Sequence, residues 1–203
     1  MKKLILITGV CSLACTLHAD IDFNYNGLSD VYEFVYFNGP ADPDADSDGD
    51  GLSNYDEMIW GTDPTDANSK VTGPTATLTA GSVQFAWFTA PFRVYELRAT
   101  EDRVTWRTLA SGSISNYTEN LTATNAPAAR FYRLSVSLPA GSDGSSLDAW
   151  EEALYVQKFG VPPSARDSDG DGLNDLQEFQ LGLQPGKKDN PAVGLVLFTP
   201  LEK

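Results

Sequence analysis

Two acidic runs of twelve residues, at 46–57 and 167–178, have the most informative chemistry in this sequence. Each follows the pattern D-x-D-x-D-G-x5-E. A hard divalent cation requires six to eight oxygen ligands, and a tightly wound loop can offer carboxylates from its first, third and fifth positions. Without a cation, three carboxylates so close together would repel one another. The two runs therefore predict calcium-binding loops.

The predicted ligands occupy the same positions in both loops. Gly51 and Gly172 at position six allow the sharp turn, because glycine adopts backbone angles that other residues avoid. A backbone carbonyl follows at position seven, a side chain binds at position nine directly or through water, and a bidentate glutamate closes the shell at position twelve. The first set is Asp46, Asp48, Asp50, Leu52, Asn54 and Glu57, and the second is Asp167, Asp169, Asp171, Leu173, Asp175 and Glu178.

A related pattern occurs at 22–33, where asparagine replaces aspartate at positions three and five. Amide oxygens are neutral, so we expect a weaker third calcium site in this loop. Its ligands would be Asp22, Asn24, Asn26, Leu28, Asp30 and Glu33. A more degenerate copy at 141–152 lacks the ligands of positions one and five and the turn glycine, and we expect it to bind no ion. A degenerate loop thus precedes a complete loop near each end of the chain.

Each loop leads into a short helical segment that stops at a glycine. Apolar residues recur at helical spacing, so that one short helix can pack on its neighbour. Units this small bury too little apolar surface to fold alone, and bound calcium would stabilise them. The predicted helices span 30–37, 54–60, 147–159 and 175–181.

Residues 1–19 have the features of a secretory signal, with Lys2 and Lys3 before an apolar stretch and a cleavage site after Ala19. The apolar stretch is short for a membrane span. We expect export to the extracellular space, the cell surface or the periplasm, with no membrane span in the mature chain. Lipid attachment at Cys15 is an alternative to simple cleavage.

Composition narrows the classes of function. Both cysteines and the only histidine, His18, lie in the predicted signal, so the mature chain would have no thiol, disulfide or imidazole. This argues against zinc sites built from Cys or His and against nucleophilic catalysis by Cys. Acidic residues outnumber basic residues 28 to 14, and 20–69 contains no Lys or Arg. We therefore expect no nucleic acid and no anionic membrane as partner.

The middle of the chain has a different composition, rich in Val, Thr, Tyr, Phe and Trp, with turn residues between short runs. Seven strands in so short a segment predict a compact antiparallel sandwich. Five runs are clear and two, near 114–118 and 121–124, are weaker. The five are 75–80, 83–88, 93–100, 104–110 and 130–137.

The complete loops, followed by Gly61-Thr-Asp-Pro in the first half and Gly182-Leu-Gln-Pro in the second, resemble bacterial thrombospondin type 3-like and dockerin-like calcium repeats. The resemblance implies calcium binding. Both loops place leucine at position seven and a polar residue at position eight, and proline-containing segments precede them, which favours a loop with one helix over a helix–loop–helix EF-hand. Runs such as Tyr95-Glu-Leu-Arg and Arg130-Phe-Tyr-Arg-Leu more loosely resemble fibronectin type III-like domains of bacterial surface proteins.

The predicted fold class is a mainly β central sandwich, of immunoglobulin or fibronectin III type, flanked by two small α-helical calcium-loop modules. The predicted divisions are a signal at 1–19, a two-loop module at 20–69, the sandwich at 70–138, a second two-loop module at 139–190, and a tail at 191–203 that could add one strand. A seven-stranded sandwich would place the modules at opposite poles, because an odd number of strands ends at the far side.

The expected function is that of an exported, non-catalytic structural, adhesion or binding module folded by at least two calcium ions. The clustered carboxylates already have a metal role, and the remaining acids have no catalytic context. Beyond calcium, a protein or a glycan at the cell surface is the expected partner. Two alternatives are a dockerin-like unit that docks to a cohesin-type partner and a carbohydrate-binding sandwich, which would require an exposed tryptophan.

Overall fold

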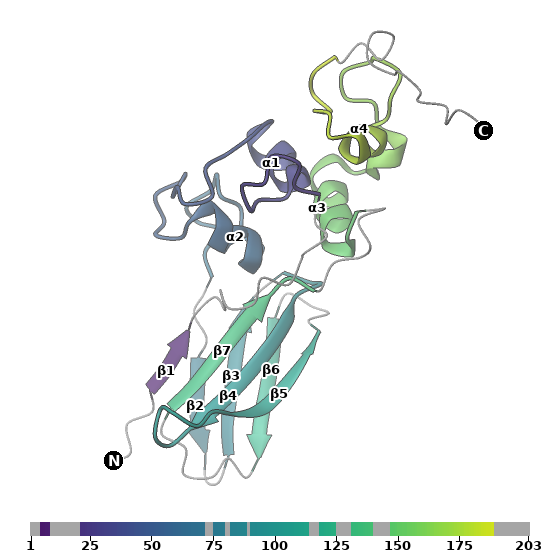
Figure 1. Ribbon diagram of the computed structural model, residues 1–203. Coiled ribbons are helices and arrows are strands. Elements are labelled where there is room, and N and C mark those ends of the chain that lie inside the picture. The colour runs from purple at the N-terminus through teal and green to yellow at the C-terminus, as the bar shows by residue number, and fades with distance from the viewer. Residues whose placement is uncertain are drawn as a thin grey trace, which may run out of the picture.

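The computed structural model describes residues 5–8, 21–71, 75–79, 82–88, 90–113, 118–124, 131–139 and 147–188. These residues form two small sheets and four α-helices, so the fold is mixed α and β (Figure 1). The helices are α1 (Asp30–Phe37), α2 (Asn54–Trp60), α3 (Ala149–Phe159) and α4 (Asp175–Leu181). The strands are β1 (Ile5–Thr8), β2 (Thr75–Thr79), β3 (Ser82–Phe88), β4 (Val94–Thr100), β5 (Arg107–Ser113), β6 (Thr118–Thr124) and β7 (Phe131–Ser137).

One sheet has the order β1-β7-β4-β5 and the other β2-β3-β6. All pairs are antiparallel except β1 with β7. Strands β3, β4 and β7 send alternate apolar side chains into one buried cluster, as the period of two along a strand requires. That cluster contains Trp60 of α2 together with Val83, Phe85, Trp87, Leu97, Ala99, Tyr132, Leu134 and Val136. The two sheets therefore share one core, and α2 contributes to it.

In the middle segment the described residues form six strands, β2 to β7. The weaker run at 121–124 lies in β6, whereas the other, at 114–118, falls outside the described residues except for its last residue. The run predicted at 104–110 begins later, at Arg107, because Asp102 organises a turn before it. The Asp102 carboxylate accepts hydrogen bonds from the N–H groups of Val104 and Thr105, both at 2.8 Å, which holds these residues out of the sheet.

Strand β1 lies inside the segment predicted to be a secretory signal. It pairs in parallel with the first part of β7, from Ile5 opposite Phe131 to Thr8 opposite Leu134. It forms the edge of its sheet, next to β7 alone. Among the described residues, no helix is long and apolar enough to cross a membrane.

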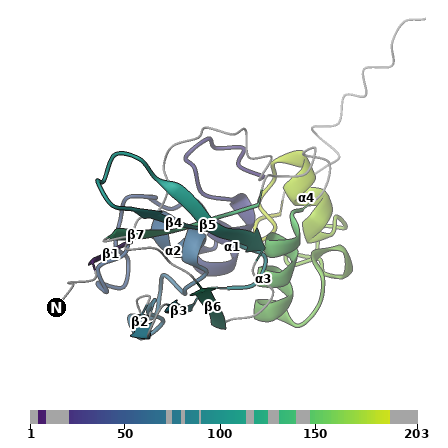
Figure 2. The same cartoon turned by 90° about the horizontal axis from the view of Figure 1, so that it is seen from below.

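The first helical segment, with α1 and α2, and the second, with α3 and α4, lie at the same end of the sheets (Figures 1 and 2). The prediction that they lie at opposite poles is therefore wrong. Between them the described part of the chain forms six strands, an even number, and the last strand ends near the helices from which the first one starts. One buried cluster joins Leu28, Tyr32, Met58 and Ile59 of the first half to Leu138 and Trp150 of the second. Another joins Ile21, Val31 and Val35 to Tyr155 and Phe179. The helices of both segments thus share their hydrophobic cores.

Arg93, at the start of β4, connects the helices to the sheets. Its guanidinium donates to the backbone oxygens of Met58 at 2.8 Å and Ile59 at 2.9 Å, near the end of α2. It also lies 5.1 Å from the ring centre of Trp150 in α3. Only 4% of Arg93 is exposed. This one side chain thus links β4 to α2 of the first helical segment and to α3 of the second.

Candidate calcium sites

The loops at 22–33, 46–57 and 167–178 have one backbone frame. In each, the N–H of position nine donates to the carbonyl of the residue before position one: Asp30 to Ile21, Asn54 to Ala45 and Asp175 to Arg166. The carboxylate at position one accepts from the N–H of position six in all three, at 2.9 to 3.1 Å. Repeated aspartate-to-backbone bonds of this kind wind a loop tightly. The structure therefore confirms that the 22–33 run is a third copy of the loop.

The turn glycines have the conformation that the pattern predicted. Gly27, Gly51 and Gly172 at position six have φ of 93°, 103° and 103°, where side chains other than glycine are strained. The polar residue at position eight, which distinguishes these loops from EF-hands, caps the following helix. Ser29, Ser53 and Asn174 each accept a hydrogen bond from a backbone N–H in the first turn. Helices α1, α2 and α4 consequently begin at position nine, as predicted.

In the loop at 46–57, one carboxylate oxygen from each of Asp46, Asp48 and Asp50 lies within 4.8 Å of the others. Three buried oxygens of this loop have no hydrogen-bond partner in the described structure: Oδ2 of Asp48, Oδ1 of Asn54 and Oε2 of Glu57. The amide nitrogen of Asn54 donates a hydrogen bond of 2.7 Å to the carbonyl of Asp42. This bond fixes the orientation of the unpaired Oδ1 of Asn54. Buried oxygens without donors are costly unless a cation binds them.

The loop at 167–178 repeats this arrangement. Asp167, Asp169 and Asp171 also have carboxylate oxygens within 4.8 Å of one another. The buried oxygens without a partner are Oδ2 of Asp169, Oδ2 of Asp171 and both Oε atoms of Glu178. The predicted carbonyl ligands, Leu52 and Leu173, follow the turn glycines, and their N–H groups donate to Asp50 and Asp171 at 2.9 Å. Both donor sets consist of oxygen atoms, as calcium requires.

Position nine differs between the two loops. The carboxylate of Asp175 accepts from the N–H and the hydroxyl of Ser168, at 2.8 and 2.5 Å, and from the hydroxyl of Tyr155. Asp175 is fully buried, and its bond with Tyr155 joins the loop to α3. Asn54 keeps an unpaired oxygen and remains a ligand candidate. Tyr155 lies 20 residues away, and no sequence pattern indicated this contact.

Burial, and to a smaller extent the nearby aspartates, raise the pKa of the two closing glutamates to about 7. Glu57 and Glu178 are both fully buried. Thr62 was not predicted as part of the site, and its hydroxyl donates 2.9 Å to Oε1 of Glu57, which lowers the pKa of that carboxyl. Thr62 belongs to the Gly-Thr-Asp-Pro run that follows the loop. A cation in either site would replace the proton that burial otherwise favours.

In the loop at 22–33, where the sequence predicts a weaker third site, the closing glutamate is engaged by donors of the chain itself. The side-chain amides of Asn24 and Asn26 donate to the two carboxylate oxygens of Glu33, at 2.7 and 2.6 Å. The N–H of Ala41 adds a bond of 2.8 Å to Oε1. Asp30 at position nine accepts from the N–H of Phe23 at 3.1 Å, and burial raises its pKa to about 6. Each oxygen of Glu33 thus has a protein donor, in contrast to Glu57 and Glu178.

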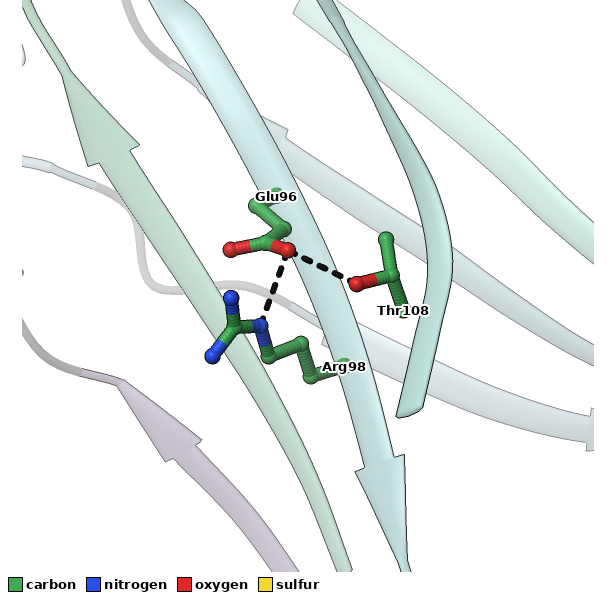
Figure 3. A network of polar contacts seen from close by, with 3 residues as sticks. All are labelled: Glu96, Arg98 and Thr108. Carbon is green, nitrogen blue, oxygen red and sulfur yellow. Dashed lines mark hydrogen bonds and ion pairs between the residues drawn. The ribbon is translucent and has the colours of Figure 1, made fainter. Parts of the chain in front are cut away.

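The degenerate copy at 141–152 falls largely outside the described residues, which resume at Leu147. Elsewhere, acidic side chains of the sheets are engaged in surface contacts. Glu96 accepts from Thr108 and pairs with Arg98, both at 2.8 Å (Figure 3). Asp102 organises the turn described above. These two carboxylates therefore serve the structure of β4 and its turn.

Comparison with known families identifies the two complete loops. The family description Bacterial TSP3 repeat matches residues 46–67 and 167–182. Repeats of this family bind calcium, and the aspartate triplet of each matched segment fits calcium binding. The match supports the predicted thrombospondin type 3-like resemblance at both places. No curated protein and no solved structure matches the chain.

Proposed function

We propose that this chain is an exported, non-catalytic structural or adhesion module whose two complete loops are ordered by calcium. The observation that carries the proposal is the set of buried, unpaired oxygens that converge in each loop. They include Oε2 of Glu57 and both carboxylate oxygens of Glu178. Such groups destabilise a fold unless they bind a cation, so calcium is required to complete it.

The position of the loops supports a structural role for the ion. Each loop leads directly into a helix that packs in the shared cores, α2 through Met58 and Ile59 and α4 through Phe179. Ordering the loop therefore fixes how the helices sit on the sheets. The two sheets with their common core are consistent with a fibronectin III-like sandwich that presents a contact surface at the cell surface.

Two alternatives have less support. A dockerin-like role requires helix faces that are exposed for a partner, but Val31, Tyr32 and Val35 of α1 are buried between the two helical segments. A carbohydrate-binding role requires an exposed tryptophan on the sheets. Trp60, Trp87 and Trp150 are buried, and Trp106 is half-buried beneath Arg133, at 4.5 Å from its ring centre.

Calorimetric titration of calcium into the chain that begins at Asp20 tests the proposal. We expect two sites with dissociation constants of about 10⁻⁴ to 10⁻³ M, as in other extracellular calcium modules. Replacing Asp48→Asn together with Glu57→Gln should remove one site, and Asp169→Asn with Glu178→Gln the other. Glu101→Gln, an exposed acid in the turn after β4, is the matched control and should retain both. A wild-type protein that takes up no calcium at millimolar concentration would refute the proposal.

A further inference from the structure

We infer that the 22–33 loop is a calcium-independent lock, in which the side-chain amides of Asn24 and Asn26 take the place of a bound cation. This inference goes beyond the proposed function, because it assigns a separate, metal-free role to one of the three loops. Three steps lead to it: the chemistry at Glu33, the orientation of the amides, and the position of α1 among the helices.

The first step compares the closing glutamates. All three occupy position twelve of the same backbone frame, and all are almost fully buried. Glu178 has no donor on either oxygen, and Glu57 has a donor on one only. Glu33 has Asn24 on one oxygen, and Asn26 and Ala41 on the other. Donated hydrogen bonds therefore satisfy Glu33, whereas its two counterparts require a cation.

The second step concerns which end of each amide faces Glu33. Oδ1 of Asn24 accepts from the N–H of Asn26 at 3.0 Å, and Oδ1 of Asn26 accepts from the N–H of Leu28 at 2.8 Å. These are the bonds that aspartate carboxylates make in the complete loops. With the oxygens committed to the backbone, the NH₂ groups must point inward, toward Glu33. A cation beside Glu33 would meet the amide N–H groups of Asn24 and Asn26 instead of their oxygens.

The third step is the position of α1, which follows this loop. The hydroxyl of Tyr32 donates 3.1 Å to the carbonyl of Asn54 in the first complete loop. The hydroxyl of Ser29 donates 2.6 Å to Glu151 in α3. The ring of Phe34 lies 6.4 Å from that of Tyr155 and 5.8 Å from that of Phe179, in the second helical segment. The metal-free loop therefore positions the helix that both calcium-binding halves contact.

These observations distinguish two parts among the helices and loops: one whose order does not depend on calcium and one whose order does. Loop 22–33 and α1 remain ordered at any calcium concentration, because their polar groups are satisfied within the chain. The loops at 46–57 and 167–178 gain order when calcium binds, and they do so against a framework that already exists. Such a framework lowers the ordering cost at each calcium site.

The experiment combines hydrogen exchange with calcium stoichiometry on the full chain. On chelation, amide exchange in 46–60 and 167–181 should accelerate by about tenfold or more, while exchange in 29–37 changes by less than about twofold. Equal acceleration in all three segments would overturn the inference. The double substitution Asn24→Asp with Asn26→Asp restores the complete pattern and should raise the calcium stoichiometry from two to three. The variant Asn24→Ser with Asn26→Ser, which removes the amides, should leave two sites and accelerate exchange in 29–37.

The outcomes separate this inference from the proposed function. A wild-type stoichiometry of three that falls to two in the Asn24→Ser, Asn26→Ser variant would show that the asparagines bind calcium, and would refute the lock alone. A wild-type stoichiometry of zero, with exchange in 29–37 unchanged by chelation, would refute the calcium proposal and leave the lock standing. Failure of the double aspartate variant to gain a site would count against the amides as the reason for the missing ion.

Discussion

The hydroxyl of Ser29 donates a hydrogen bond of 2.6 Å to Oε1 of Glu151, so the start of α1 is joined to α3 across a sequence separation of 122 residues. Ser29 also caps α1 by accepting from the N–H groups of Val31 and Tyr32. Ser29 and Glu151 are both buried. The bond unites the halves of the chain that precede and follow the sheets.

Ser29→Ala should therefore destabilise the protein more than the loss of a helix cap alone. We expect the free energy of unfolding to fall by about 2 kcal/mol, because a cap is lost and a buried carboxylate loses a donor. Ser53→Ala removes the cap of α2 and should cost about 1 kcal/mol. Denaturant unfolding of both variants in saturating calcium measures the difference. Equal losses would show that the bond to Glu151 contributes nothing beyond the cap.

Arg93→Ala should weaken the connection between helices and sheets. The carbonyls of Met58 and Ile59 would lose their side-chain donor, and Trp150 would lose its cationic neighbour. We expect a loss of about 2 to 4 kcal/mol in the free energy of unfolding, with Arg93→Lys intermediate because lysine lacks the guanidinium geometry. Exposed Arg107→Ala is the control and should change stability little. A small effect of Arg93→Ala would mean that apolar packing alone holds the helices on the sheets.

The calcium-free protein should become less stable as pH rises from 5 to 8. The folded-state pKa values of Glu57 and Glu178 are raised to about 7, above the ordinary 4.5 of glutamate, and that of Asp30 is raised to about 6, above the ordinary 3.8 of aspartate. The folded state therefore binds more protons than the unfolded state in this window, and its stability falls as pH passes the folded pKa values. Thermal unfolding in chelator across this range tests the sign.

When calcium is present, the quantity expected to change between pH 5 and 8 is the apparent affinity for calcium. Protons and calcium compete for Glu57 and Glu178, so the apparent affinity for calcium should increase as pH rises through about 7. Glu57→Gln should weaken this dependence. A calcium affinity that is the same at pH 5.5 and pH 8 would show that these carboxylates do not bind the ion.

Removal of residues 1–19 should leave the fold in place and free one edge of β7. Strand β1 pairs with β7 at four positions only and lies at the edge of its sheet. We expect the shortened chain to retain its circular dichroism spectrum. An edge without a neighbour can pair with another chain, so weak self-association is expected as well. Light scattering at increasing protein concentration measures it, and collapse of the spectrum would show that β1 is required for folding.

The parts of this structure that the sequence predicted are those formed by interactions between residues close in sequence. The bounds of α1, α2 and α4 agree with prediction, because the cap at position eight and the left-handed residue after the last turn are encoded within each segment. The aspartate triplets of the two complete loops were predictable for the same reason. Their oxygens are placed by hydrogen bonds between neighbouring residues, such as Leu52 to Asp50 and Leu173 to Asp171.

What the sequence could not determine depends on contacts between distant residues. Asp175 fits the ligand pattern, yet Tyr155 and Ser168 engage it. Asn24 and Asn26 supply neutral oxygens in the pattern, but the fold commits those oxygens to the backbone and turns the amide groups toward Glu33. The strand count determines at which end the chain leaves the sheets, and the described residues between the two helical segments form six strands, an even number. Residues close in sequence thus determine the chemistry of the loops. The shared cores of the helices, the role of Arg93 and the hydrogen bonds of the 22–33 loop required the tertiary structure, because each depends on side chains that meet only after folding.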